Sequence, residues 1–233
     1  MRKRFGYFLF CLFIVSAILG ISTLGSRTIT VLSEVEPIER EHRILLDPGH
    51  GGEDGGSSSP EGKPESEYNL EISLRLRDLF CFLGFETDMT REEDLSIYTR
   101  GETLAQKKIS DLKERVRIAQ ETDNAVLLSI HQNHFSDSRY SGAQVFYAST
   151  EGSDMLAQTL QTAFCRTLNP SSRRQCKKSS GIYLMEHVPC TAVLIECGFL
   201  SNTEEEARLR SAVYQKKICC VIASAVSEYL SNT

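Results

Sequence analysis

The 233-residue sequence has no Cys-x-x-Cys spacing, no visible internal repeat and no excess of positive charge. Without Cys-x-x-Cys pairs, a structural zinc ribbon is not expected. The net charge of −5 becomes −8 once Arg2, Lys3 and Arg4 are set aside with the N-terminal segment, which argues against a nucleic-acid partner. With 41% hydrophobic and 24% charged residues, the chain has the composition of one globular domain with a tail, not of a disordered, collagenous or coiled-coil protein.

Cysteine is present, but not in a pattern that defines a disulfide framework. Of the eight cysteines, Cys11 lies in the N-terminal segment, so seven remain in the rest of the chain. Because seven is odd, at least one must be free or paired between chains. Cys197, Cys219 and Cys220 occur in strongly apolar stretches and are interpreted as small core residues.

The N-terminal segment carries basic residues and then a long apolar run. Residues 5–25 are uncharged and long enough for a membrane span of about 20 residues. This pattern predicts a signal peptide or membrane anchor at 1–25, and the lack of a clear Ala-x-Ala site favours the uncleaved anchor. Basic residues tend to stay cytoplasmic, so the remainder is expected to be exported. Residues 26–42 are polar and are predicted to be a linker, which leaves 43–233 as the folded domain.

From residue 43 onward, short strand-like runs alternate with helical patterns. Six runs have the length of strands: 43–47, 85–90, 125–131, 143–147, 182–185 and 192–196. Four amphipathic stretches predict helices: about 65–83, 109–121, 153–168 and 212–230. Strands separated by helices predict a single α/β domain with a largely parallel, twisted sheet flanked by helices on both faces.

Two histidines follow apolar runs in equivalent places. The segment LLDPGHGGEDGG places His50 after a strand and in a glycine-rich turn, where open α/β sheets carry their chemistry. His131 ends AVLLSIH in the same way. His134 is a competing candidate, but it lies three residues into the loop, so His131 is preferred. His42 and His187 are expected to face solvent.

The first predicted helix directs a carboxylate inward. Its apolar stripe recurs at spacings of four, three and four residues: Ile72, Leu76, Leu79 and Leu83. Glu65 precedes Ile72 by seven residues, about two turns, and so points the same way, whereas Glu67 points away. An inward carboxylate costs several kcal/mol unless it is paired, and a metal ion would satisfy it. The alternative is that Glu65 only complements the helix dipole from the first turn.

Glu196 ends the apolar run VLIE and is a candidate general base; the alternative is a strand-end carboxylate bonded to backbone amides. Two histidines and one glutamate form the His₂Glu set of hydrolytic zinc sites, which leaves a fourth position for water. The sequence therefore predicts one Zn²⁺ held by His50, Glu65 and His131. Asp47 and Asn133 are candidates for orienting the histidines or the substrate, although Asp47 also fits a turn former before proline.

Six strings in this order resemble the zinc-dependent N-acetylmuramoyl-L-alanine amidases of the amidase_3 family, over roughly residues 43–230: LLDPGHGG, ESEYNL, TREED, SIHQN, SGAQVFY and VLIECGFLSN. The short form and the string GIYLMEH resemble the germination-specific branch of spore-forming bacteria. The resemblance implies zinc ligation by His50, Glu65 and His131, with Glu196 as the catalytic glutamate. Ser66 and Cys197 depart from the lysine and the threonine or small apolar residue that are common there, and neither departure removes a ligand.

The resemblance also implies the substrate and the setting. The family cleaves the amide between the lactyl group of N-acetylmuramic acid and L-alanine in peptidoglycan, and the spore branch acts in forming muramic-δ-lactam in the cortex. We therefore expect peptidoglycan as partner, membrane contact through the N-terminal segment and an extracytoplasmic location. The sequence leaves open whether a protein activator is needed.

Two other functions remain open at this point. A zinc exopeptidase or deacylase could use the same ligands on another amide, because fold and metal do not fix the substrate. A non-catalytic cell-wall-binding protein would usually lack a ligand or the base, and all four residues are present.

Four basic residues of a serine-rich loop could meet stem-peptide carboxylates, but a solvated charge cluster is the preferred interpretation: Arg173, Arg174, Lys177 and Lys178.

Overall fold

The structure is a computed structural model that describes residues 41–232. The predicted signal peptide or anchor at 1–25 and residues 26–40 of the predicted linker lie outside the described residues. Within the described part, no helix combines the length and the apolar composition needed to cross a membrane.

The described residues form one sheet with the strand order β2-β1-β3-β6-β4-β5. Its strands are β1 Arg43–Pro48, β2 Thr87–Met89, β3 Ala125–Asn133, β4 Gln144–Tyr147, β5 Lys177–Lys178 and β6 Thr191–Phe199. Strands β1, β2, β3 and β6 are mutually parallel, β4 is antiparallel to β6, and β5 is parallel to β4. This confirms the predicted α/β domain with a largely parallel sheet.

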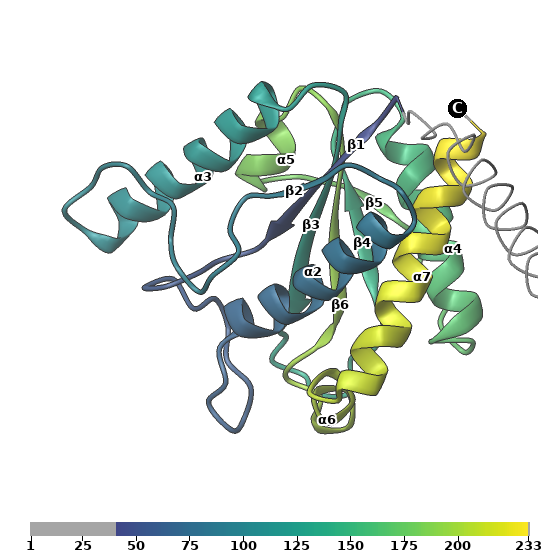
Figure 1. Ribbon diagram of the computed structural model, residues 1–233. Coiled ribbons are helices and arrows are strands. Elements are labelled where there is room, and N and C mark those ends of the chain that lie inside the picture. Colours follow the sequence, from purple (N-terminus) through teal and green to yellow (C-terminus); the bar gives the residue numbers. More distant parts are fainter. Residues whose placement is uncertain (1–40, 233) are drawn as a thin grey trace, which may run out of the picture. The chain divides into compact units, whose positions relative to one another are not determined.

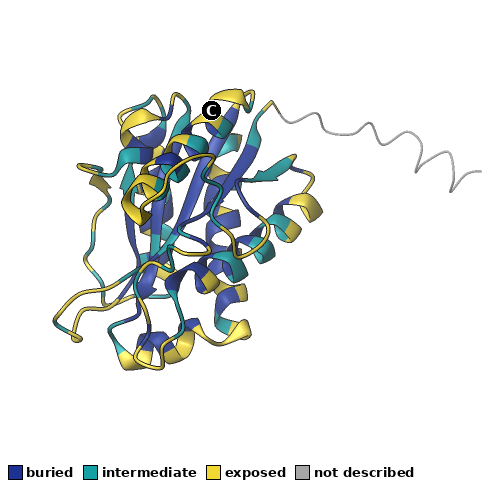
Figure 2. Ribbon diagram, turned by 90° about the vertical axis from the view of Figure 1, so that its left-hand side faces the viewer, coloured by how far each residue is buried: buried dark blue, intermediate teal, exposed yellow. Residues whose placement is uncertain are grey.

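Helices cover both faces of this sheet. They are α2 Glu65–Phe82, α3 Leu104–Glu121, α4 Ser153–Thr167, α5 Tyr183–His187, α6 Thr203–Leu209 and α7 Ala212–Ser231. Figure 1 shows α2, α4 and α7 on one side of the sheet and α3 and α5 on the other. The protein has two hydrophobic cores, and alternate residues of a strand contribute to one or the other. Ile44 and Leu46 pack toward α2, whereas Leu45 packs toward α3. Figure 2 shows that the buried residues concentrate on the strands.

Helix α2 buries a slightly different stripe from the predicted one. Its fully buried hydrophobic residues recur every fourth position: Tyr68, Ile72, Leu76 and Phe80. Leu83 is 38% exposed, which corrects the prediction that it belongs to the stripe. The helix ends at Phe82, so Leu83 has the cap conformation and leaves the helical row, while Phe80 packs edge-to-face on Phe85.

The apolar run at 182–185, predicted to be a strand, instead supplies the N-cap residue Ile182 and the first three residues of the short helix α5. Four apolar residues carry too little periodicity to separate a strand from one helical turn. Leu184 and Met185 are adjacent and both buried, which a strand with one covered face would not allow.

Three further elements differ from the sequence prediction. Helix α3 begins five residues early, because Thr103 caps it and forms a reciprocal capping box with Gln106. Helix α6 and the two-residue strand β5 were not predicted at all. The side chain of Asn202 caps α6 by accepting a hydrogen bond from the N–H of Glu205.

All seven cysteines of the described residues are free. Cys197 and Cys219 are buried in the core, as expected from their apolar surroundings. Cys220 is exposed, so its assignment to the core was wrong. Adjacent residues of a helix point about 100° apart, and only Cys219 faces the sheet.

Candidate metal centre

The candidate residues converge at the carboxyl edge of the three central parallel strands. Residue Pro48 of β1 is in register with Ile130 of β3, and His131 of β3 is in register with Glu196 of β6. Helix α2 begins at the same edge with Glu65, so a helix N-terminus meets three strand ends. This is the usual position of ligand sites in open α/β sheets.

His50, Glu65 and His131 lie within reach of one ion. Their donor atoms all lie within 4.8 Å of one another. The Nδ1 of His131 is 2.9 Å from Oε1 of Glu65, and the Nε2 of His50 is 3.5 Å from the same oxygen. Ligands at zinc-bond lengths in a tetrahedral site are about 3.4 Å apart. The two imidazoles and the carboxylate therefore fit zinc by donor type and by spacing.

Two glycines leave the room that this arrangement needs. A Cβ on Gly49 would lie 2.1 Å from Nε2 of His131, and a Cβ on Gly56 would lie 2.7 Å from both Cδ2 of His50 and Oε2 of Glu65. Gly56 also has a φ of 72°, which disfavours other residues. Side chains at either position would collide with a candidate ligand.

Hydrogen bonds fix both oxygens of the Glu65 carboxylate. The backbone N–H and the hydroxyl of Ser57 donate to Oε2 at 3.1 and 2.9 Å. The amide of Asn69 and the backbone N–H of Gln132 donate to Oε1 at 3.3 and 3.2 Å. Glu65 is only 4% exposed whereas Glu67 is exposed, as the helix-face argument predicted.

Asp54, which the sequence analysis missed, orients the His50 ring. Its Oδ2 is 3.0 Å from Nδ1 of His50, and its Oδ1 is 2.7 Å from Nζ of Lys108. A carboxylate at Nδ1 favours the tautomer that leaves the Nε2 lone pair free, and Nε2 faces Glu65. The position of Asp54, four residues after His50 in a glycine-rich loop, was the available clue.

The charges around the three candidate ligands favour a cation between them. Burial lowers the pKa of His50, but hydrogen bonds with Asp54 and Glu65 outweigh it and raise the pKa to about 9. Burial raises the pKa of Glu65, yet the two histidines bring it well below its usual range. The carboxylates of Asp54 and Glu65 are therefore both ionised at neutral pH, and a metal ion can take the place of the Nε2 proton of His50 between them.

Two buried arginines, also missed, hold the loop that carries His50. Arg115 of α3 donates to the carbonyls of Pro48 and His50 at 2.9 and 2.7 Å. Arg91 donates to the carbonyls of Pro48 and Gly49 at 2.9 and 3.1 Å. Three consecutive carbonyls are thus bonded to guanidinium groups, and the loop conformation is fixed before any ligand binds.

Asp47 lies beneath this loop, and its contacts lead to the His50 backbone through Arg115. It pairs with Arg115 at 2.5 Å and accepts hydrogen bonds from Ser129 and Thr90 at 2.6 and 2.7 Å. Burial raises the pKa of Asp47, but Arg115 and the two hydroxyls outweigh it and lower the pKa to about 2. Asp47 is therefore a permanently charged anchor for Arg115.

Glu196 lies beside the trio as the cross-strand neighbour of His131. Burial raises its pKa to about 7, despite the opposing charges of His131 and His50. Its Oε2 is inaccessible to solvent and has no hydrogen-bond partner among residues 41–232. Glu196 as a whole is only half-buried, so its carboxyl group can exchange a proton with a molecule that enters the site beside the three candidate ligands.

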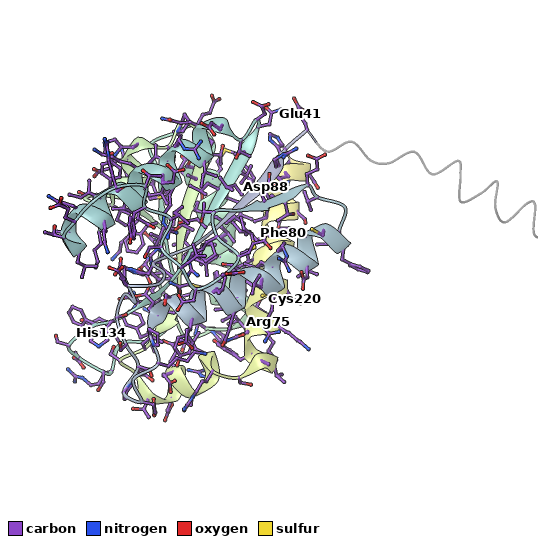
Figure 3. All side chains as sticks on the ribbon, turned by 60° about the vertical axis from the view of Figure 1, so that its left-hand side comes forward. Glu41, Arg75, Phe80, Asp88, His134 and Cys220 are labelled. Carbon is purple, nitrogen blue, oxygen red and sulfur yellow. The ribbon has the colours of Figure 1, made fainter. Side chains whose placement is uncertain are left out.

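The remaining candidates lie at different depths. His134 is exposed on the loop after β3, and Figure 3 places it at the periphery of the molecule. His187 is exposed and stacks on Tyr183, whereas His42 is partly buried rather than fully solvent-facing. Asn133 is the last residue of β3 and is half-buried.

Most of the basic loop is solvated, as interpreted from the sequence. Arg173, Lys177 and Lys178 are exposed. Arg174 differs, because its guanidinium lies 5.1 Å from the centre of the Phe199 ring and is half-buried.

A pocket of about 250 Å³ opens beside the histidines. Its walls include the candidate ligands His50 and His131 and three leucines of α3, α5 and β6: Leu112, Leu184 and Leu194. The site can therefore admit a small substrate group next to the donor atoms.

Comparison with known proteins identifies relatives of this chain. The family model described as N-acetylmuramoyl-L-alanine amidase matches residues 44–228. The germination-specific N-acetylmuramoyl-L-alanine amidase of Bacillus subtilis (strain 168) is 36% identical over 192 residues, which cover 81% of this chain and 80% of that protein.

Two solved structures share the fold. The CwlD amidase from Clostridioides difficile, in complex with the GerS lipoprotein, has a TM-score of 0.79 and 37% identity, covering 82% of this chain and all of that chain (100%). The N-acetylmuramoyl-L-alanine amidase from Clostridium difficile 630 has a TM-score of 0.72 and 27% identity, covering 83% of this chain and 98% of that chain.

Proposed function

Since the chain belongs to the amidase_3 family of N-acetylmuramoyl-L-alanine amidases, we propose that His50, Glu65 and His131 hold one zinc ion. With this ion the protein hydrolyses an amide bond of peptidoglycan. The observation that carries the proposal is the convergence of these three side chains, from three separate elements, on one point beside Glu196. The bond cleaved is the amide between the lactyl group of N-acetylmuramic acid and L-alanine.

Each residue has a distinct task in this reaction. When bound, the zinc ion supplies Lewis-acid chemistry, which makes water more acidic and polarises a carbonyl. Glu196 accepts a proton from the attacking water and returns it to the alanine nitrogen as the C–N bond breaks. Burial raises the pKa of Glu196 above that of an ordinary carboxyl group, which suits a residue that must both accept and return a proton. The products are a lactyl carboxylate and a peptide with a free alanine N-terminus.

The remaining residues keep the ligands in place. Asp54 sets the tautomer of His50, while Ser57 and Asn69 hold the carboxylate of Glu65 in its orientation. Such supporting contacts are worth about 10–100-fold in metal affinity when they are lost.

The biological setting is also part of the proposal. The 36% identity to a germination-specific amidase supports a role in spore cortex maturation and germination. We assign 43–233 as the catalytic domain, 26–42 as a linker and 1–25 as a signal peptide or membrane anchor, which places the enzyme on the extracytoplasmic side. The related amidase solved with a lipoprotein supports a protein partner of that kind here.

The test is mass spectrometry of the fragments that the purified full chain releases from peptidoglycan, with zinc and with a chelator. Stem peptides that begin with a free L-alanine, formed only with zinc, are the expected result. Free amino acids from peptide ends would instead indicate an exopeptidase. Bound zinc without any cleavage, either alone or with the proposed protein partner, would indicate a non-catalytic wall-binding protein.

A further inference from the structure

Two aromatic rings project from the loop between β3 and β4. Phe135 is 48% exposed and Tyr140 is 47% exposed, and their ring centres are 4.9 Å apart in an edge-to-face arrangement. The Tyr140 ring is also 6.3 Å from the buried ring of Phe199, the last residue of β6. The mechanism above gives neither exposed ring a task.

The aromatic pair lies at the same edge of the sheet as the candidate metal centre. Phe135 follows His131 by four residues, so their Cα atoms are at most about 14 Å apart. Phe199 follows Glu196 by three residues and is in register with Asn133. His134, next to Phe135, marks this edge in Figure 3.

Hydrogen bonds to the segment after β6 hold this loop in place. The backbone N–H of Phe135 donates to Ser201 Oγ at 3.1 Å, and the amide of Asn202 donates to the carbonyl of Ser138 at 2.8 Å. The buried carboxylate of Glu205 accepts from the N–H of Gly142 at 2.9 Å. The rings are therefore presented by a fixed loop, so a ligand would not have to order it.

The charges of this loop cancel one another. Asp137 and Arg139 form an ion pair at 2.7 Å. Arg174, the nearby arginine over Phe199, donates to the carbonyl of Ser141 and interacts electrostatically with the buried carboxylate of Glu205. Two partly exposed rings without net charge around them suit the C–H face of a neutral sugar, whereas an acidic stem peptide would favour free arginine or lysine side chains.

We propose that Phe135 and Tyr140 form a platform on which a sugar ring of the peptidoglycan glycan strand stacks, next to the muramic acid whose amide is cleaved. The proposal rests on the proposed function, because the candidate metal centre fixes where the scissile amide lies. The platform makes the enzyme act on glycan strands in preference to isolated muropeptides.

The test compares wild-type full chain with the double variant Phe135→Ala/Tyr140→Ala on two substrates. With polymeric glycan that carries stem peptides, KM should rise about tenfold while kcat is unchanged, because ring contact is lost but the chemistry is not. With a muropeptide that contains a single sugar, both constants should stay at the wild-type value. Val213→Ala, which removes a 66%-exposed side chain on α7, is the matched control.

A binding measurement separates this proposal from the proposed function. Peptide-free glycan strands should bind the wild type and Tyr140→Phe, and bind the double variant about tenfold more weakly. Wild-type affinity in the double variant, or equal losses on both substrates, would overturn the platform. A lower molecular mass of the double variant than of the wild type in light scattering would also overturn the platform, because it would make the pair a self-association surface. Failure of the wild type to release alanine-terminated peptides would instead contradict the proposed function.

Discussion

Replacing Gly49 by alanine would place a methyl group against the ring of a proposed zinc ligand. The new Cβ would lie 2.1 Å from Nε2 of His131, whereas ordinary contact begins at 3.4 Å. The ring would have to move by about 1.3 Å, and its Nδ1 is the atom that now lies 2.9 Å from Glu65. Gly49 does not have a positive φ, so alanine adds no backbone strain and the effect is steric.

The size of the effect follows from this displacement. A shift of about 1 Å in a functional group can lower a reaction rate about 100-fold. Loss of a contact that supports a metal ligand lowers metal affinity about 10–100-fold. We therefore expect Gly49→Ala to weaken zinc binding by about 10–100-fold. Overpacking should also lower the free energy of unfolding by about 1–3 kcal/mol.

The assay is zinc affinity of the full chain, measured by competition with a fluorescent chelator, together with thermal unfolding. Gly55→Ala is the matched control, because it lies in the same loop, lacks a positive φ and would place its Cβ 3.1 Å from Pro64 rather than against a ligand. Equal zinc affinities in Gly49→Ala and the wild type would refute the steric argument and the assignment of His131 as a ligand.

Three further predictions concern individual carboxylates. Glu196→Gln should keep zinc and lose about 10²–10⁴-fold in kcat, since an amide cannot accept the proton; comparable zinc loss would make Glu196 a ligand instead. Glu65→Ala should lose zinc by elemental analysis while the exposed Glu67→Ala keeps it, and the reverse would contradict the helix-face argument. Asp47 has a folded pKa of about 2, below its unfolded value of 3.8, so its stabilisation is present above pH 4 and is lost as pH falls toward 2. Urea unfolding should show the wild type losing about 2 kcal/mol more than Asp47→Asn between pH 5 and pH 2; equal losses would contradict a buried, charged Asp47.

The central strands and the long helices could be predicted because their signals are local. The strands β1, β3 and β6 are continuous apolar runs, as expected for strands covered on both faces. Helix α5 was missed because its apolar turn is too short to show a period. The early start of α3 was missed because the capping pair Thr103 and Gln106 precedes the apolar pattern.

The three candidate ligands could be found from the sequence because each follows from its own element. His50 and His131 continue strands, and Glu65 shares the inward direction of its helix. Arg91 and Arg115 could not be found in this way, because they bond backbone carbonyls far away in the sequence, and Asp47, the buried acidic partner of Arg115, is 68 residues away from it. Carbonyls carry no sequence signature, so these contacts emerge only when the chain is folded.

The two edges of the sheet bear on how this protein behaves at high concentration. The edge strand β2 has three residues and lies beside the charged pairs that Arg43 makes with Glu86 and Asp88. The other edge, β5, consists of two exposed lysines, Lys177 and Lys178. A neighbouring molecule that added a strand at either edge would gain few backbone hydrogen bonds and would meet fixed charge. The two sheet edges of the described residues thus disfavour edge-to-edge pairing between molecules.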